Sequence, residues 1–122
     1  MNIGLIGIGT VGGGTYQVLK ENAAEISNKS GIEIKITHVA DKNLKLAKET
    51  VENETIVEED AFSLIENSSI DTIIELIGGT GIALDIVRKA LENGKHVVTA
   101  NKALIAMHGE ELFKIANKKN VL

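Results

Sequence analysis

Three glycines near the amino terminus, Gly7, Gly9 and Gly12, have the spacing of a phosphate-binding turn. They follow an apolar run at residues 3–6 and precede a stretch with helical periodicity. That order of strand, glycine turn and helix is the context in which G-x-G-x-x-G binds a dinucleotide. Gly7 permits the tight turn, Gly9 lets the backbone approach a pyrophosphate, and Gly12 lets the helix pack close to the strand. A glycine turn without a ligand is the weaker alternative, because the flanking elements fit the motif.

A carboxylate, Asp41, ends an alternating stretch at residues 32–41, which we interpret as the second strand. An acid at this place bonds a ribose 2′-hydroxyl, although Asp41 lies farther from Gly12 than the usual ~20 residues. The repulsion between a carboxylate and a 2′-phosphate about 4 Å away costs about 4 kcal/mol at an effective dielectric of ~20, so Asp41 favours NAD over NADP. The adjacent Lys42 could pair with such a phosphate, so use of NAD or NADP stays open.

Small and polar residues follow two further apolar segments. Gly78 and Gly79 come after the segment at 71–77 and would let backbone approach a nucleotide, with a plain turn as the alternative. Thr99, Asn101 and Lys102 come after the segment at 96–99. In a doubly wound sheet, ligands bind outside the carboxyl ends of the strands, so we expect these groups to face the reactive half of the cofactor.

Lys102 is the residue of this set best suited to chemistry. It could act as a cation near a carbonyl oxygen or donate to the nicotinamide ribose. The alternative is a solvated lysine at the start of a helix. A cation there opposes the helix dipole, which favours a functional reason for its presence.

Other polar residues give weaker signals. Glu75 lies inside an apolar strand, where it either flanks the edge of the sheet or holds a buried hydrogen bond. The three histidines, His38, His96 and His108, lack metal-ligand spacing, so we expect structural roles for them and no metal site. The absence of cysteine excludes disulfides, thiolate metal sites and a cysteine nucleophile.

Strands and helices alternate along the chain. The patterns predict strands at 3–6, 32–41, 71–77 and 96–99, and helices at 11–28, from 61, at 82–91 and at 103–119. In residues 43–58 we expect only a short helix and a surface loop, with Glu58–Asp60 opening the helix from 61. Val121–Leu122 resembles the start of another strand. The order predicts an α/β fold, a Rossmann-type doubly wound parallel sheet in three α/β/α layers.

Composition bounds the class of protein. At 122 residues the chain makes one domain, and 43% hydrophobic residues are ordinary for a globular protein. Its net charge of −4 argues against nucleic acid as a partner. No apolar stretch reaches membrane-spanning length and no signal peptide precedes the first strand, so we expect a cytoplasmic protein without a membrane partner.

Four segments together resemble homoserine dehydrogenase. They are Gly-Ile-Gly-Thr-Val-Gly-Gly-Gly (7–14), Glu-Leu-Ile-Gly-Gly (75–79), Lys-His-Val-Val-Thr-Ala-Asn-Lys (95–102) and His-Gly-Glu-Glu-Leu (108–112). Thr-Ala-Asn-Lys is the most specific of them, whereas the glycine motif fits many dehydrogenases. The resemblance runs over the whole chain but covers only the amino-terminal NAD(P)-binding domain of that family.

The resemblance implies NAD(P)-linked interconversion of L-homoserine and L-aspartate 4-semialdehyde, a step toward threonine, methionine and isoleucine. The residues that would line the pyrophosphate are Ile8, Gly9, Thr10 and Val11. Gly78, Gly79 and Thr99 would border the nicotinamide. Lys102 would lie at the boundary between cofactor and substrate and assist hydride transfer.

This sequence also departs from the family. The substrate-binding and dimerisation domain, with its acidic and lysine residues and its monovalent-cation site, would follow Leu122. We therefore expect a homodimer for the full-length protein, and cofactor binding without turnover for this chain. Asp41–Lys42 differs from the arginine-bearing turn of members that prefer NADP.

Two other functions stay open. One is the cofactor domain of another small-substrate dehydrogenase, such as an aspartate dehydrogenase, against which Thr99–Lys102 argues. The other is a free-standing NAD-binding module that senses redox state, against which the apolar ending Val121–Leu122 argues.

Overall fold

The computed structural model describes residues 1–77 and 81–121 of the chain. Within them, the strands are β1 (Asn2–Ile6), β2 (Lys35–Ala40), β3 (Ile56–Glu58), β4 (Thr72–Glu75) and β5 (His96–Thr99). The helices are α1 (Thr10–Ser30), α2 (Leu44–Thr50), α3 (Ala61–Glu66), α4 (Gly81–Glu92) and α5 (Lys102–Lys119).

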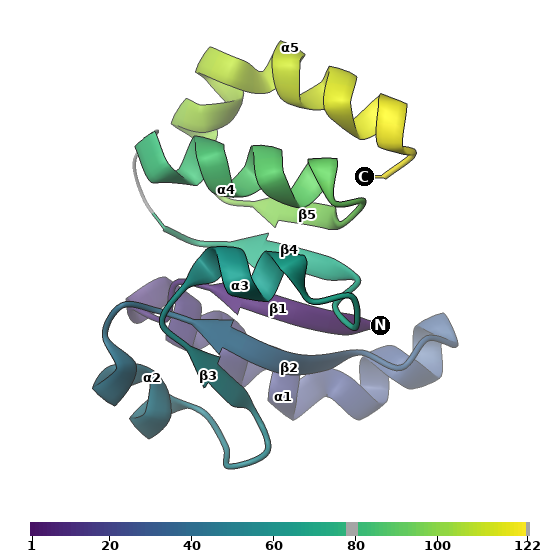
Figure 1. The fold of residues 1–122 in the computed structure, drawn as a ribbon. Coiled ribbons are helices and arrows are strands. Elements are labelled where there is room, and N and C mark those ends of the chain that lie inside the picture. Colours follow the sequence, from purple (N-terminus) through teal and green to yellow (C-terminus); the bar gives the residue numbers. More distant parts are fainter. Residues whose placement is uncertain (78–80, 122) are drawn as a thin grey trace.

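The strands form one parallel sheet in the order β3-β2-β1-β4-β5. The chain moves outward from β1 to β3 and then returns to place β4 on the other side of β1. The gap between β1 and β4 is therefore a switch point, beside which α/β proteins bind ligands. All strand arrows in Figure 1 point the same way, so the carboxyl ends meet at one edge. The predicted doubly wound parallel sheet is confirmed.

Helices cover both faces of the sheet (Figure 1). On one face, Tyr16 of α1 is buried in a cluster with Leu5 of β1. On the other, Ile6 of β1 lies in a cluster with Leu64 of α3 and Ile86 of α4. Because side chains alternate along a strand, Leu5 and Ile6 point to opposite faces, which is why a nearly continuous apolar run makes a central strand.

The last helix packs mainly on its neighbour. Leu104 and Leu112 of α5 are buried against Val87 and Leu91 of α4. Figure 1 shows α5 stacked beyond α4 at the β5 end of the sheet. The start of α5 is thereby held close to the carboxyl end of β5.

Two strands are shorter than predicted. The strand predicted at 32–41 begins at Lys35, because Lys35 pairs with Asn2 and β1 offers no partner to earlier residues. The strand predicted at 71–77 is limited to Thr72–Glu75, which pairs with Ile3–Ile6. In each case the length of β1, and not the apolar pattern, sets the length of its neighbour.

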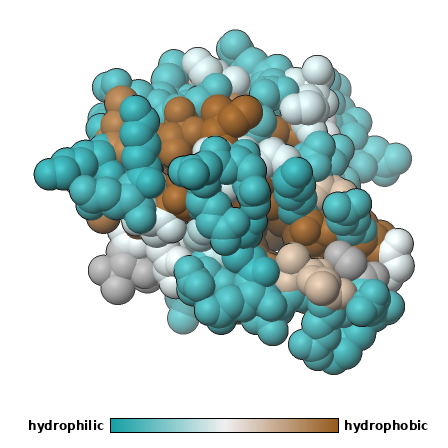
Figure 2. All heavy atoms as spheres, turned by 90° about the horizontal axis from the view of Figure 1, so that it is seen from below, coloured by the Kyte–Doolittle hydropathy of each residue, from teal (hydrophilic) through white to brown (hydrophobic). Residues whose placement is uncertain are grey.

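The expectation that residues 43–58 hold only a helix and a loop was wrong. Ile56–Glu58 form β3, which pairs on one side with β2. Ile56 is 53% exposed and the strand has only three residues, so it lacks the apolar pattern that predicted the other strands. Seen from the β3 side (Figure 2), hydrophobic side chains reach the surface among hydrophilic ones.

Smaller boundaries also differ from prediction. Glu58 belongs to β3, whereas Asp60 caps the start of α3 as expected. Val121 lies outside any strand, so the predicted strand does not begin there, and Leu122 lies outside the described residues.

A buried lysine joins two turns at the amino ends of the strands. Lys95 is only 7% exposed, and its Nζ donates to the carbonyl oxygens of Asn67 (2.7 Å) and Ile70 (2.6 Å). Burial lowers its pKa, while the charge of Asp71 opposes that shift. The ammonium thus ties the segment before β4 to the segment before β5.

We predict that Lys95→Met lowers the free energy of unfolding by about 2 kcal/mol or more, because two inward-facing carbonyls lose their donor. Urea denaturation of the chain measures this. Lys45→Met, at an exposed position of α2, is the control and should shift stability by less than ~0.5 kcal/mol. Equal effects of the two substitutions would contradict a structural role for the Lys95 ammonium.

Candidate dinucleotide-binding site

The glycine turn has the geometry that its sequence predicts. Gly7 has a φ of +97°, which side-chain-bearing residues rarely adopt, and its N–H donates to the Ala40 carbonyl at 2.9 Å. A Cβ at Gly12 would overlap the carbonyl oxygen of Gly7. The tight turn at Gly7 and the close approach of helix and strand at Gly12 are thus both confirmed.

The start of α1 is arranged as an anion site. The N–H of Gly13 donates to the Gly9 carbonyl at 2.7 Å, which makes Gly9 the residue before the first helical turn. The N–H groups of Thr10, Val11 and Gly12 precede this bond and have no carbonyl one turn earlier in the helix. A Cβ at Gly9 would meet no heavy atom within 4 Å. The space that a pyrophosphate needs against this backbone is open.

Asp41 lies beside the glycine turn and holds it. Its Oδ2 accepts from the N–H of Ile8 at 2.7 Å, and its Oδ1 accepts from the N–H of Asn43 at 2.8 Å. Sequence reasoning assigned Asp41 to a ribose and missed this contact, because a backbone partner leaves no signal in a motif. Each carboxylate oxygen has a second lone pair, so the carboxylate can hold the turn and still accept from a hydroxyl.

A hollow lies between the glycine turn, the end of β2 and the start of α4. It comprises two adjoining cavities of about 320 and 240 Å³. The larger is lined by Gly7, Gly9, Ala40, Asp41, Lys42, Leu76, Ile77 and Ile82. The smaller shares Ala40, Asp41, Lys42, Ile77 and Ile82 and adds Ile6, Glu59, Asp60, Ala61, Phe62 and Ile86.

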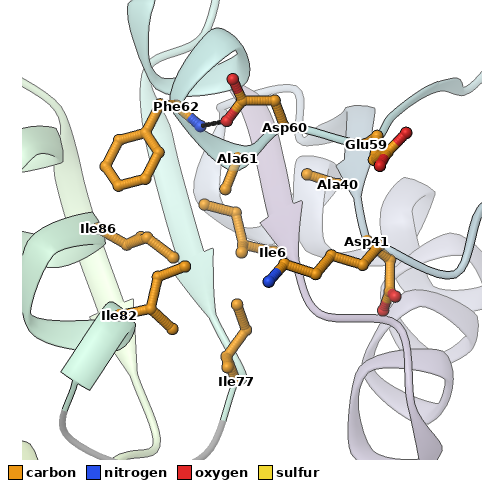
Figure 3. Close-up of a pocket in the computed structure, with 11 residues that line it drawn as sticks. Ile6, Ala40, Asp41, Glu59, Asp60, Ala61, Phe62, Ile77, Ile82 and Ile86 are labelled. Atoms are coloured by element: carbon orange, nitrogen blue, oxygen red, sulfur yellow. Dashed lines mark hydrogen bonds between the residues drawn. The ribbon is translucent and has the colours of Figure 1, made fainter.

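The smaller cavity has an apolar wall and an acidic margin. In Figure 3, Ile82 and Ile86 of α4 lie opposite Ile6 of β1, while Asp41 and Glu59 stand at the rim. An apolar slot beside carboxylates suits a flat base carrying a hydroxylated sugar. Sequence reasoning missed this wall, since Ile82 and Ile86 read only as the core stripe of a helix.

A second polar group connects the ends of β4 and β5, which pair Glu75 with Thr99. The hydroxyl of Thr99 donates to Oε2 of Glu75 at 2.6 Å and accepts from the N–H of Asn101 at 3.0 Å. Oδ1 of Asn101 in turn accepts from the N–H of Leu104 at 3.0 Å and caps α5. Lys102 is the exposed first residue of that helix. The structure thus brings Thr99, Asn101 and Lys102 together at one strand end.

Of the two explanations offered for Glu75, the buried hydrogen bond is confirmed and the sheet edge is wrong, because β4 lies between β1 and β5. Burial raises the pKa of Glu75, although the hydroxyl of Thr99 and the amide of Ile77 favour the charged form.

Other predicted features fall outside this site. Gly78 and Gly79 lie outside the described residues. His38 bonds Thr37 at 2.8 Å and Asn67 at 3.3 Å, as a structural histidine does. Among residues 1–77 and 81–121, no group of three acidic, histidine or cysteine side chains could hold a metal ion. The same residues include no helix with the length and hydrophobicity to cross a membrane.

Comparison with known proteins identifies the family. The family described as "Homoserine dehydrogenase, NAD binding domain" matches residues 7–122. This chain belongs to that family. A homoserine dehydrogenase NAD-binding domain therefore contains the glycine turn, Asp41 and the Thr99–Lys102 segment. The expected class of cofactor, a nicotinamide dinucleotide, is confirmed.

Individual relatives agree with this assignment. The homoserine dehydrogenase of Methylobacillus glycogenes is 51% identical over 98% of this chain, and that of Neisseria gonorrhoeae is 48% identical over all of it. The crystal structure of a homoserine dehydrogenase from Thiobacillus denitrificans superposes on 99% of the chain with a TM-score of 0.92 and 43% identity. The chain spans only 29%, 28% and 28% of the lengths of these three relatives.

We predict that Gly9→Ala weakens cofactor binding without destabilising the fold, whereas Gly12→Ala destabilises the fold. Gly9→Ala should leave the unfolding midpoint close to that of the unmodified chain but weaken NAD(H) binding at least tenfold, about 1.4 kcal/mol, since its methyl enters the space proposed for the pyrophosphate. Gly12→Ala should destabilise the chain by about 1–3 kcal/mol, because its methyl meets Gly7.

Thermal unfolding followed by calorimetric titration checks both variants. Gly14→Ala is the matched control, because a Cβ at Gly14 also meets nothing within 4 Å and Gly14 lies beyond the G-x-G-x-x-G motif. Unchanged affinity in Gly9→Ala would show that the dinucleotide does not approach this backbone.

Proposed function

We propose that residues 1–122 are the cofactor-binding domain of a homoserine dehydrogenase that interconverts L-homoserine and L-aspartate 4-semialdehyde. The chain belongs to this family, and its carboxylate Asp41 accepts from the Ile8 amide of the glycine turn. This contact lies beside a cavity at the switch point, and it is the observation on which the proposal mainly rests. The remaining length of the relatives would supply substrate binding and dimerisation.

In this proposal the cofactor's adenosine half binds around the glycine turn. The amides of Thr10, Val11 and Gly12 would hold the pyrophosphate at the positive end of α1, while Ile8, whose N–H donates to Asp41, would line it. Asp41 would accept from a ribose hydroxyl, and the base would lie in the apolar cavity. The carboxylate favours NAD over NADP, although Lys42 lines the same cavities and could pair with a 2′-phosphate.

The reactive half would lie toward the ends of β4 and β5. Gly78, Gly79, Thr99 and Asn101 would border the nicotinamide there. When bound, the nicotinamide supplies the hydride acceptor. The carbinol carbon of homoserine would give its hydride to the nicotinamide, and its hydroxyl proton would pass to a base in the part beyond this chain. The Lys102 ammonium, at the boundary with the substrate, would stabilise the negative charge that develops on the oxygen.

We infer a cytoplasmic enzyme of threonine, methionine and isoleucine biosynthesis that acts as a homodimer through the part beyond this chain. Relatives named homoserine dehydrogenase, matched over nearly the whole chain, support the enzyme assignment from which this setting is inferred. Nucleic acid and membrane play no part in it.

We predict that the isolated chain binds NAD(H) and that Asp41→Ala weakens this binding by about 1.5 kcal/mol or more, roughly tenfold, as expected for a hydrogen bond to a charged group. Calorimetric titration with NAD(H) and NADP(H) measures both affinities. A gain in NADP(H) binding by the variant would identify Asp41 as the charge that excludes a 2′-phosphate.

The control is Glu92→Ala at the exposed end of α4, which should bind like the unmodified chain. Asp41→Asn separates the effect of charge from that of the contact with Ile8, since one amide oxygen remains to accept. Equal binding of NAD(H) by the unmodified chain and Asp41→Ala would contradict the ribose role.

We predict that the full gene product oxidises L-homoserine with NAD(P), whereas the 122-residue chain does not, because this chain spans under a third of the length of the enzymes that it matches. Absorbance of the reduced cofactor reports turnover. A parallel screen with L-aspartate tests the alternative of an aspartate dehydrogenase. Turnover of homoserine by the isolated chain would refute the assignment of substrate binding to the missing part.

A further inference from the structure

Glu75 is a costly residue for the position that it occupies. It lies in β4, is fully buried, and follows the apolar residues Ile73 and Ile74. Its Oε1 is buried without a well-aligned hydrogen bond among the described residues. A carboxyl group so placed destabilises a fold relative to an apolar side chain of similar size. Packing alone therefore gives no reason for a carboxyl group here.

The hydrogen bond between Glu75 and Thr99 leads toward Lys102. The Thr99 hydroxyl donates its hydrogen to Oε2 of Glu75, which fixes the direction of that hydrogen. A lone pair of Thr99 Oγ1 is then left to accept from the N–H of Asn101. Asn101 then caps α5 through Leu104, and Lys102 follows directly. Every link lies at the carboxyl ends of β4 and β5, on the edge where the site lies.

We propose that Glu75 is a positioning residue for Lys102: through Thr99 and Asn101 it sets the turn from which the lysine projects toward the reacting groups. The inference rests on the proposed function, in which Lys102 lies between cofactor and substrate. Oε2 can accept from Thr99 whether or not the carboxyl group is protonated, so the raised pKa that burial gives Glu75 does not break the link.

Glu75→Met tests the proposal, because methionine fills a similar volume but cannot accept from Thr99. In the full gene product, kcat for homoserine oxidation should fall tenfold or more, as a catalytic group that is displaced by about 1 Å can lose up to ~100-fold. The dissociation constant for NAD(H) should change little. Stability should stay equal or rise, since a buried carboxyl group is removed. A purely structural role for Glu75 predicts the reverse: lower stability with kcat preserved.

Glu75→Gln is the rescue variant, since its amide oxygen can accept from Thr99, and it should recover most of the lost kcat. Thr72→Val is the matched control: it changes another buried side chain of β4, at the far end from the site, whose Oγ1 has no hydrogen bond among the described residues. Its kcat should equal that of the unmodified protein.

A double-mutant cycle locates the effect in the hydrogen bond. If Glu75 acts through Thr99, then Glu75→Met combined with Thr99→Val should reduce kcat no more than Thr99→Val alone. Losses that multiply would overturn the proposal, and so would an unchanged kcat in Glu75→Met.

The same link can be tested without turnover, which keeps the inference distinct from the proposed function. In the 122-residue chain, Glu75→Met should speed hydrogen exchange at the Asn101 amide, measured by NMR, while Thr72→Val should not. Absence of homoserine turnover by the unmodified full gene product would refute the proposed function. Unchanged exchange at Asn101 in Glu75→Met would refute the link itself.

Discussion

The close contact between Gly12 and Gly7 is the constraint on which the rest of the site depends. It brings α1 against the end of β1 at a distance that no side chain permits. The amino end of the helix, and with it the row of amides that precedes the first helical bond, is thereby placed directly over the switch point between β1 and β4. Asp41 completes this arrangement by accepting from Ile8, so that β2 and the turn form one unit.

Part of this could be predicted from the sequence because some strands carry a clear apolar pattern. Residues 3–6 form an apolar run and Val97–Val98 form a shorter one, and these segments fall where β1 and β5 lie. The glycine motif predicted a turn, the start of a helix and a class of ligand together, because each glycine is required for a different steric reason. These are local signals, which a single segment carries by itself.

What could not be predicted depends on partners distant in the chain. The start of β2 is set by the pairing of Lys35 with Asn2. Residues 56–58 form a strand because they pair with the free side of β2. The contact of Asp41 with Ile8 joins a side chain to a backbone amide, and the apolar cavity wall from α4 resembles any other core stripe. Glu75 was visible as an anomaly, but its explanation required the register that places it opposite Thr99.

Buried ionisable side chains link β4 and β5 at both ends. Lys95 joins the segments that lead into the two strands, and Glu75 joins the strands where they end. With both ends tied, β5 has little freedom to slide or pivot against β4, and α5 is carried along through its cap. We therefore expect the segment from β4 to the start of α5 to move as one unit, so that a closing motion around a bound ligand would come from other segments.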